Sequence, residues 1–346
     1  MKGPPLIRAC PFLFWIEISI ATGYEGMSRL KRLVCWALGG LLGLLLAAFL
    51  TIYLTVPVWL PRAIVDAPNA GMIIDPAADP AATRLRELGV TAHHRIEVGP
   101  PTASLALYQI DPPPGIVVRG TILVLHGIHD CKESQVGTGR YLAGLGYRAI
   151  LLDLRGHGRS TGRFLTYGVV ESRDCRQVLD WLDERGLLVQ PVGAVGFSYG
   201  GVVSVHLAAI DPRVAAVVTV STFASLREVL GDYVVHYMPI VGRMLTREQL
   251  GEALSEAGRL ANFDPSAADT MRAAQNIMAP LLIIHGGRDD RIPLRHAYEI
   301  QNAAIGCSGL LILPDEDHDS IMADRSGAVQ SALCRWFSEW GRSASR

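Results

Sequence analysis

The sequence predicts an α/β fold with a mostly parallel central sheet and helices on both faces. Short apolar runs that suit buried strands recur from residue 121 onward, and most are separated by helical stretches such as 171–185 and 199–210. These runs are continuously apolar, which is typical of strands covered by helices on both sides. Reactive residues follow several of them, as expected where the carboxyl ends of parallel strands meet. The expected strands are residues 94–98, 105–110, 121–125, 149–152, 192–195, 214–220, 281–284 and 310–313.

Composition excludes several classes of protein. The chain has 346 residues, of which 49% are hydrophobic, and this is enough for one large core. The formal net charge of -1 gives no basic excess for phosphate binding, so we expect no nucleic-acid partner. The six cysteines show neither close pairs nor metal-ligand spacing, and they predict neither a disulfide framework nor a metal site.

Residues 33–56 carry no charge and are expected to form a transmembrane helix that ends at Pro57. A helix of this length, at about 1.5 Å per residue, crosses a hydrocarbon core of roughly 30 Å. Trp36 lies near one end of the run and Trp59 near the other, as suits the membrane interface. Basic residues at 29–32 precede the span. By the positive-inside rule we expect a single-pass protein with a cytoplasmic N-terminus and its main domain on the outer, periplasmic or extracytoplasmic, face.

The alternative interpretation of this segment is a cleaved signal peptide. A signal peptide has a shorter apolar region, followed by a small-residue cleavage site that residues 54–59 do not offer. Within the cytoplasmic segment 1–32, residues 1–26 fit neither an anchor nor a signal. Because Met27 opens a conventional basic-then-apolar anchor, we treat residues 1–26 as a candidate start-site artefact.

The remaining chain is expected to contain a linker, a main domain and a lid. Residues 57–90 include a stretch rich in proline, alanine and aspartate, which predicts a tether over the surface. The main domain then covers residues 91–346. Residues 222–278 are too many for a simple connection and contain helical patterns, so they predict a small lid. On this organisation, removal of residues 1–60 should leave a soluble and active domain.

Residues 196–200 spell GxSxG directly after the expected strand at 192–195. A serine on a tight strand-to-helix turn projects its hydroxyl out of the sheet, where a base and a substrate carbonyl can reach it. The flanking glycines fit because side chains there would clash as the helix packs back on the strand. The motif therefore predicts a nucleophile elbow at Ser198.

Four further motifs follow other expected strands in the same order along the chain. They are HG at His126, DxRGHGxS at 153–160, GxxDxxIP at 286–293, and the late His318. With GxSxG, they make the sequence resemble the α/β-hydrolase family over residues 121–340. The closest likeness is to single-pass bacterial members and to the membrane-attached BEM46-like serine hydrolases, in the branch that includes the S33-like serine aminopeptidases.

The resemblance implies a catalytic triad in the family's order Ser, Asp, His. Ser198 would be the nucleophile and His318 its general base. Asp289 would fix the tautomer of His318 and stabilise the imidazolium. The neighbouring Asp290 competes for this role, and the GxxDxxIP register favours Asp289.

The resemblance also implies an oxyanion hole made by the backbone N–H groups of Ile128 and Tyr199. His126 corresponds to the family's structural histidine. The side chains that we expect to line the substrate pocket are His129, Tyr233, Tyr237 and Met238. No cofactor and no metal are expected.

These observations predict a membrane-anchored serine hydrolase that cleaves a carboxylic ester through an acyl-enzyme. The substrate would be a small-molecule acyl ester, with a lipid or a peptide as other possibilities. One alternative is a serine peptidase or amidase of the same fold. An alternative of another class is a catalytically inactive hydrolase fold that serves as a binding or scaffold protein.

Overall fold

The computed structural model describes residues 28–69 and 82–343. The chain divides into two compact units, one ending at Val56 and the other beginning at Pro57. The first unit carries most of helix α2 (Arg29–Val65), whose most apolar window has a mean hydropathy of 2.4 and is not buried. Its apolar side chains are exposed, Trp36 by 72% and Leu44 by 71%. This part of α2 is long and apolar enough to cross a membrane.

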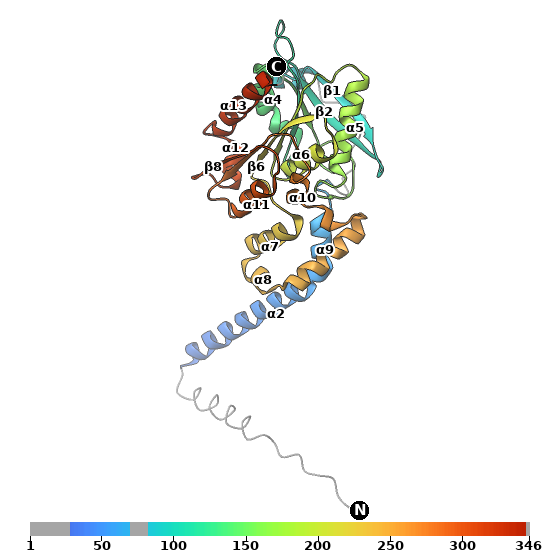
Figure 1. Cartoon of the computed structure of the whole chain (residues 1–346). Helices are drawn as coiled ribbons and strands as arrows, with labels where there is room; N and C mark the ends of the chain where they lie inside the picture. Colours follow the sequence, from blue (N-terminus) through green and yellow to red (C-terminus); the bar gives the residue numbers. More distant parts are fainter. Residues whose placement is uncertain (1–27, 70–81, 344–346) are drawn as a thin grey trace, which may run out of the picture. The chain divides into compact units, whose positions relative to one another are not determined.

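In the second unit the described residues form one eight-stranded sheet with the order β1-β2-β4-β3-β5-β6-β7-β8 (Figure 1). The first two strands run antiparallel to their neighbours, and the others are parallel. All eight expected strands are confirmed to within two residues at each end. The strands are β1 (Ala92–Val98), β2 (Ala103–Ile110), β3 (Thr121–Leu125), β4 (Arg148–Leu152), β5 (Val192–Phe197), β6 (Val214–Val220), β7 (Leu281–Gly286) and β8 (Ser308–Leu313).

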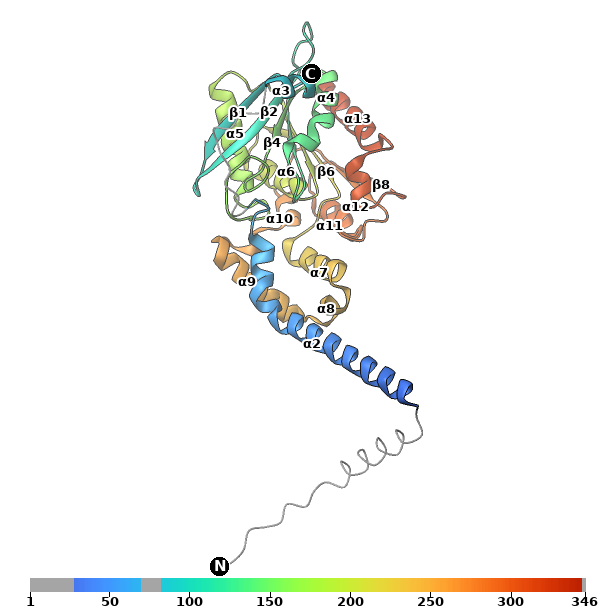
Figure 2. The same cartoon turned by 180° about the vertical axis from the view of Figure 1, so that it is seen from behind.

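Helices cover both faces of this sheet (Figure 2). Helices α4 and α13 contribute to one apolar cluster with side chains of the strands, while α5, α6, α10 and α11 contact one another in succession. The helices of this unit outside the segment between β6 and β7 and outside α2 are described by these bounds: α4 (Val136–Gly144), α5 (Glu171–Glu184), α6 (Tyr199–Ile210), α11 (Arg295–Ala303), α12 (His318–Ala323) and α13 (Ala328–Ser343), with the short helices α3 (Ala82–Leu88) and η1 (Lys132–Gln135). Two further short helices, η2 (Pro265–Ala267) and α10 (Thr270–Ala274), precede β7.

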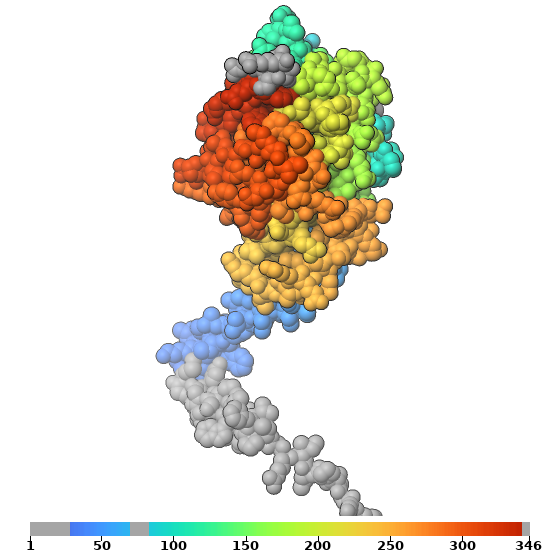
Figure 3. Space-filling model, viewed as in Figure 1, coloured from blue at the N-terminus to red at the C-terminus, as the bar shows by residue number. Residues whose placement is uncertain are grey.

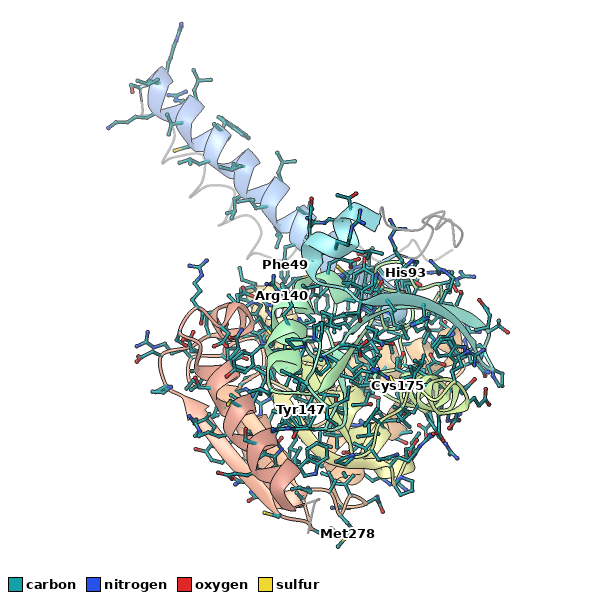
Figure 4. The ribbon with its side chains drawn as sticks, turned by 90° about the horizontal axis from the view of Figure 1, so that it is seen from above. Phe49, His93, Arg140, Tyr147, Cys175 and Met278 are labelled. Carbon is teal, nitrogen blue, oxygen red and sulfur yellow. The ribbon has the colours of Figure 1, made fainter. Side chains whose placement is uncertain are left out.

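Tyr147 ties the start of β4 to helix α13, beside which it lies in Figure 4. Its hydroxyl donates a hydrogen bond of 2.7 Å to the carbonyl of Phe337, and its ring packs against Phe337 and Trp340. A buried tyrosine whose hydroxyl has a partner combines a large apolar contact with a satisfied polar group. This contact fixes the last helix on the sheet.

The chain between β6 and β7 forms the expected helical lid. It contains α7 (Leu226–Tyr237), α8 (Pro239–Met244) and α9 (Arg247–Ala261). Ser225 caps α7 by accepting from the N–H of Glu228, and Thr246 begins α9 with a capping box. In the space-filling view these residues, gold to orange, form one end of the domain (Figure 3).

The expected tether at 57–90 is wrong for its described parts. Helix α2 continues through Pro57 and Pro61 to Val65, although proline removes an intrahelical hydrogen bond. The apolar face of this extension offsets that loss, because Leu60 is 4% exposed and Ile64 3%. Residues 82–90 also pack, with Leu85 and Val90 buried. Residues 70–81 lie outside the described residues.

Three hydrogen bonds hold the end of α2 on the loop before α5. The Tyr167 hydroxyl donates to the carbonyl of Ile64 at 2.6 Å. The N–H of Leu165 donates to Val65 at 2.8 Å, and the N–H of Ala67 to Arg163 at 3.0 Å. The hydrolase domain therefore begins at the end of α2, well before residue 91. Removing residues 1–60 would cut into it.

Truncating Leu60 tests whether the end of α2 is part of the domain. Leu60→Ala should lower the free energy of unfolding by about 2–5 kcal/mol, because it leaves a cavity at a buried position. Val58→Ala, on the same helix at a position that is 75% exposed, should change it by less than about 0.5 kcal/mol. Thermal unfolding of the detergent-solubilised chain measures both. Equal stability of the two variants would show that the end of α2 does not pack on the domain, as expected of a surface tether.

Candidate active site

Ser198 occupies a sharp turn between β5 and α6. Its backbone has φ 51° and ψ −113°, a strained conformation for a residue with a side chain. A Cβ atom on Gly196 would collide with the carbonyl of Gly200, so glycine is required where the helix folds back on the strand. The N–H of Ser198 donates to Val220 on the neighbouring strand at 2.7 Å. The predicted strand-to-helix turn is thus present at Ser198.

The Ser198 side chain opens onto a cavity of about 630 Å³ whose lining also includes His318. Ser198 is 3% exposed, and its Oγ forms no hydrogen bond of normal geometry within the described residues. Catalytic hydrogen bonds are often long in an enzyme without substrate, so this geometry is compatible with a nucleophile. The serine and the histidine therefore face one space that a substrate can enter.

His318 and Asp289 meet at the ends of two neighbouring strands. Asp289 follows β7 and His318 follows β8, and these strands pair in parallel register up to Gly286 opposite Leu313. The Nδ1 of His318 lies 2.7 Å from Oδ2 of Asp289. The N–H groups of Arg291 and Ile292 donate to Oδ1 of the same carboxylate, at 3.1 and 2.8 Å. Both oxygens of Asp289 are therefore fixed.

The environment keeps Asp289 ionised. Burial alone would raise its pKa, but the hydrogen bond and charge of His318 and the N–H of Ile292 outweigh burial and hold the pKa below its ordinary value. An ionised Asp289 accepts the Nδ1 proton and leaves Nε2 of His318 as the basic nitrogen. Asp290 points elsewhere: its side chain is 82% exposed and lies 3.5 Å from His236. The structure brings Asp289, and not its neighbour, to His318.

The loop after β3 brings Ile128 close to the elbow. Strands β3 and β5 pair with Leu125 opposite Gly196, and a Cβ on Gly127 would lie 3.6 Å from Cβ of Ser198. Tyr199 is the first residue of α6, where N–H groups have no intrahelical acceptor. The backbone N–H groups of Ile128 and Tyr199, which are expected to bind an oxyanion, thus follow the ends of two adjacent strands, β3 and β5.

Two buried contacts hold this loop in place. His126 accepts from the N–H of Leu154 at Nε2, so its Nδ1 donates to the carbonyl of Gly127. Lys132 is 1% exposed and binds Asp153 through both its backbone N–H and its Nζ. Both ring nitrogens of His126 therefore bind backbone groups of the loops that follow β3 and β4.

Two other titratable groups near the elbow, His157 and Cys131, are kept neutral. Burial lowers the pKa of His157 to about 3, and its ring lies between those of His126 and Tyr199. Burial and Glu133 raise the pKa of the Cys131 thiol to about 11. A thiol is a poor nucleophile when protonated, so Cys131 does not compete with Ser198.

The four side chains predicted to line the substrate pocket, His129, Tyr233, Tyr237 and Met238, all line the cavity that contains Ser198. The end of α2 supplies four further lining residues that the sequence did not predict. The sequence placed Trp59 at the membrane interface instead. The four-residue spacing of Leu60 and Ile64 is typical of a helix with a buried apolar face. Pro57 suggested instead that the helix ends before them. The residues missed are Trp59, Leu60, Ala63 and Ile64.

Among the described residues, Glu228, His296 and Glu299 form the one group with metal-ligand spacing. The Nδ1 of His296 accepts from the N–H of Ala224 at 3.2 Å, and Nε2 lies 2.8 Å from Asp232. Both ring nitrogens are thus engaged, and this cluster gives no support for a metal site.

A family model described as "alpha/beta hydrolase fold" matches residues 120–239. The chain is 30% identical over 220 residues to the uncharacterized protein Rv2307c of Mycobacterium tuberculosis. The matched region covers 63% of this chain and 69% of that protein. It is 26% identical to acylamino-acid-releasing enzyme 2 of rice, over 58% of this chain and 28% of that enzyme. The chain belongs to the α/β-hydrolase family.

The fold also matches solved structures of hydrolases. The Pyrococcus furiosus esterase Pf2001 superimposes with a TM-score of 0.58 at 19% identity, over 78% of this chain and 98% of the esterase. The Pyrococcus horikoshii acylaminoacyl peptidase gives a TM-score of 0.54 at 16% identity, over 75% of this chain and 43% of that chain. At such identity the likeness shows the fold. In this chain Ser198, Asp289 and His318 follow β5, β7 and β8.

Neutralising the two adjacent aspartates separately tests the register of the site. Asp289→Asn should lower hydrolytic kcat by about 10⁴, because an amide at this position cannot hold the same histidine tautomer. Asp290→Asn keeps the backbone and removes an exposed charge, so it should retain most activity. Steady-state kinetics of both purified variants measure the two losses of activity. A larger loss in Asp290→Asn would overturn the assignment of Asp289.

Proposed function

We propose that the protein is a membrane-anchored serine hydrolase that cleaves carboxylic esters with Ser198, His318 and Asp289. One observation carries the proposal: a serine on a strained turn shares a cavity with a histidine whose other nitrogen is bound to a buried carboxylate. A serine becomes a competent nucleophile when such a base is available.

In the acylation step, Ser198 Oγ attacks the acyl carbon while His318 Nε2 takes the serine proton. The negative charge that develops on the carbonyl oxygen is stabilised by the N–H groups of Ile128 and Tyr199. When the tetrahedral intermediate collapses, the ester C–O bond breaks and His318 returns its proton to the leaving alcohol. Ser198 is then acylated.

In the deacylation step, water attacks the acyl-Ser198 carbonyl and gives its proton to His318. Collapse of the second tetrahedral intermediate releases a carboxylic acid, and the proton returns to Ser198 Oγ. Asp289 stays ionised throughout and stabilises the imidazolium. No step calls for a cofactor.

The ester is favoured over a peptide by the character of the cavity. Its lining includes a set of apolar side chains from α2 and α7, such as Ile64, Leu230 and Val234. An apolar wall suits an acyl chain, whereas a peptide leaves polar backbone groups that need partners. Because some relatives are peptidases, amide cleavage is the competing hypothesis. Hydrolysis of aminoacyl p-nitroanilides by the purified protein would support it.

We also propose that residues 33–56 anchor the protein with its N-terminus in the cytoplasm and its hydrolase domain outside. The support is the exposed apolar surface of α2 and the basic residues that precede it. An apolar helix of this kind needs a bilayer to cover it.

A reporter fusion tests this topology. Alkaline phosphatase fused after Arg346 should be active, because the positive-inside rule places that end outside the cytoplasm. A fluorescent protein that matures in the cytoplasm, fused at the same position, should be dark. The reverse pattern would contradict the proposed orientation.

Replacing the nucleophile tests the proposed chemistry. Ser198→Ala should lower kcat for p-nitrophenyl butyrate by about 10⁶ and abolish labelling by a fluorophosphonate, because the attacking oxygen is gone. Ser204→Ala is the matched control, since Ser204 is buried on α6, the helix that follows Ser198, and its hydroxyl donates to the carbonyl of Gly200. It should keep both properties. Full activity of Ser198→Ala would exclude the proposed mechanism.

A further inference from the structure

We propose that the substrate is an ester with a long acyl chain drawn from the bilayer, and that the last turns of α2 form the wall that binds this chain. The inference rests on the proposed ester hydrolysis at Ser198 and names its substrate class. It is carried by the composition of the cavity, by its position along the chain and by the contact that joins α2 to the elbow.

The cavity has an extended apolar wall. Trp59, Ala63 and Ile64 of α2 line it together with Leu226 and Leu230 of α7. Its volume of about 630 Å³ falls within the range of roughly 300–1,000 Å³ that encloses a drug-sized ligand. A short acyl group such as acetyl would leave most of this wall without a partner. A long acyl chain would cover it.

The charged lining residues come from other elements, as do Ser134 and Gln135. His129, Asp130 and Gln135 belong to the segment after β3, and Arg291 pairs with Asp319 at 3.0 Å. Hydrated groups of a leaving alcohol can meet these side chains, while the apolar chain meets α2 and α7. The cavity thus offers separate partners to the two parts of an amphipathic ester.

The apolar wall begins beside the expected membrane span. Trp59 comes three residues after Val56, and three residues reach at most about 11 Å. Chain connectivity therefore keeps Trp59, the first residue of the wall, within this distance of the end of the expected span. The lid adds exposed apolar side chains on α8, Ile240 at 71% and Met244 at 50%. Lipid is the partner that fits an apolar surface held next to a membrane helix.

One side chain joins the wall to the nucleophile. The hydroxyl of Tyr167 donates to the carbonyl of Ile64, and its ring packs edge-on against Tyr199 at 5.7 Å. Tyr199 directly follows Ser198 and supplies one of the proposed oxyanion donors. The position of the acyl wall is therefore set relative to the reacting atoms.

The chain-length profile is the first test. The full chain, reconstituted in phosphatidylcholine vesicles, is assayed with p-nitrophenyl acetate, butyrate, octanoate and palmitate. Each methylene buried on the wall should raise kcat/KM by up to about fourfold, the ratio that corresponds to about 0.8 kcal/mol. We expect palmitate or octanoate to be preferred over butyrate. A maximum at acetate or butyrate would overturn the inference.

Narrowing the wall is the second test. Ala63→Trp should lower the ratio of kcat/KM for palmitate to that for butyrate by about tenfold, because an indole displaces roughly two methylenes of the acyl chain. Val58→Trp changes an exposed position of the same helix outside the cavity lining and should leave this ratio unchanged. Equal ratios in both variants would show that α2 does not bind the chain.

Delivery from the bilayer is tested by mixing vesicles. Hydrolysis of p-nitrophenyl palmitate should be much faster when the ester and the protein share a vesicle than when they are in separate vesicles. Equal rates of hydrolysis in the two arrangements would show that the ester does not reach the cavity from the bilayer that holds the protein. Failure of the proposed function is distinguishable, since no ester of any length would then be hydrolysed and fluorophosphonate would not label Ser198.

Discussion

Gly196 and Gly200 approach so closely between β5 and α6 that a side chain at Gly196 would collide with the turn, and this packing holds Ser198 at φ 51°. A non-glycine residue in such a conformation costs about 1–3 kcal/mol, which the surrounding sheet must offset. The parallel strands do so: β3, β7 and β8 end at the same edge as β5 and bring Ile128, Asp289 and His318 to it. The site is a consequence of that shared edge.

Helix α2 combines two kinds of surface in one continuous element. Its apolar residues 33–56 are suited to a bilayer, and its residues 57–65 pack on the hydrolase domain and line the cavity. Tyr167 connects this packing to Tyr199 beside the nucleophile. The end of α2 supplies part of the cavity wall, so changes after residue 56 should alter the choice of substrate.

Much of the fold could be predicted from the sequence because both faces of the sheet are covered. Its strands are therefore apolar runs, and glycine-flanked Ser198 marks the elbow. The GxxDxxIP spacing favoured Asp289 over Asp290. It could not show that the N–H groups of Arg291 and Ile292 fix the Asp289 carboxylate. The end of α2 was missed for a different reason. A helix face buried by protein has the same composition as one buried by lipid, and Pro57 suggested a stop.

In the proposed mechanism Ser198 is the residue that becomes acylated. The full chain in detergent can be treated with a fluorophosphonate, digested, and analysed by mass spectrometry to locate the adduct. We expect a single adduct on Ser198, because this is the serine at the elbow that shares the cavity with His318. An adduct on Ser134, which also lines the cavity, or no adduct on a folded chain, would contradict it.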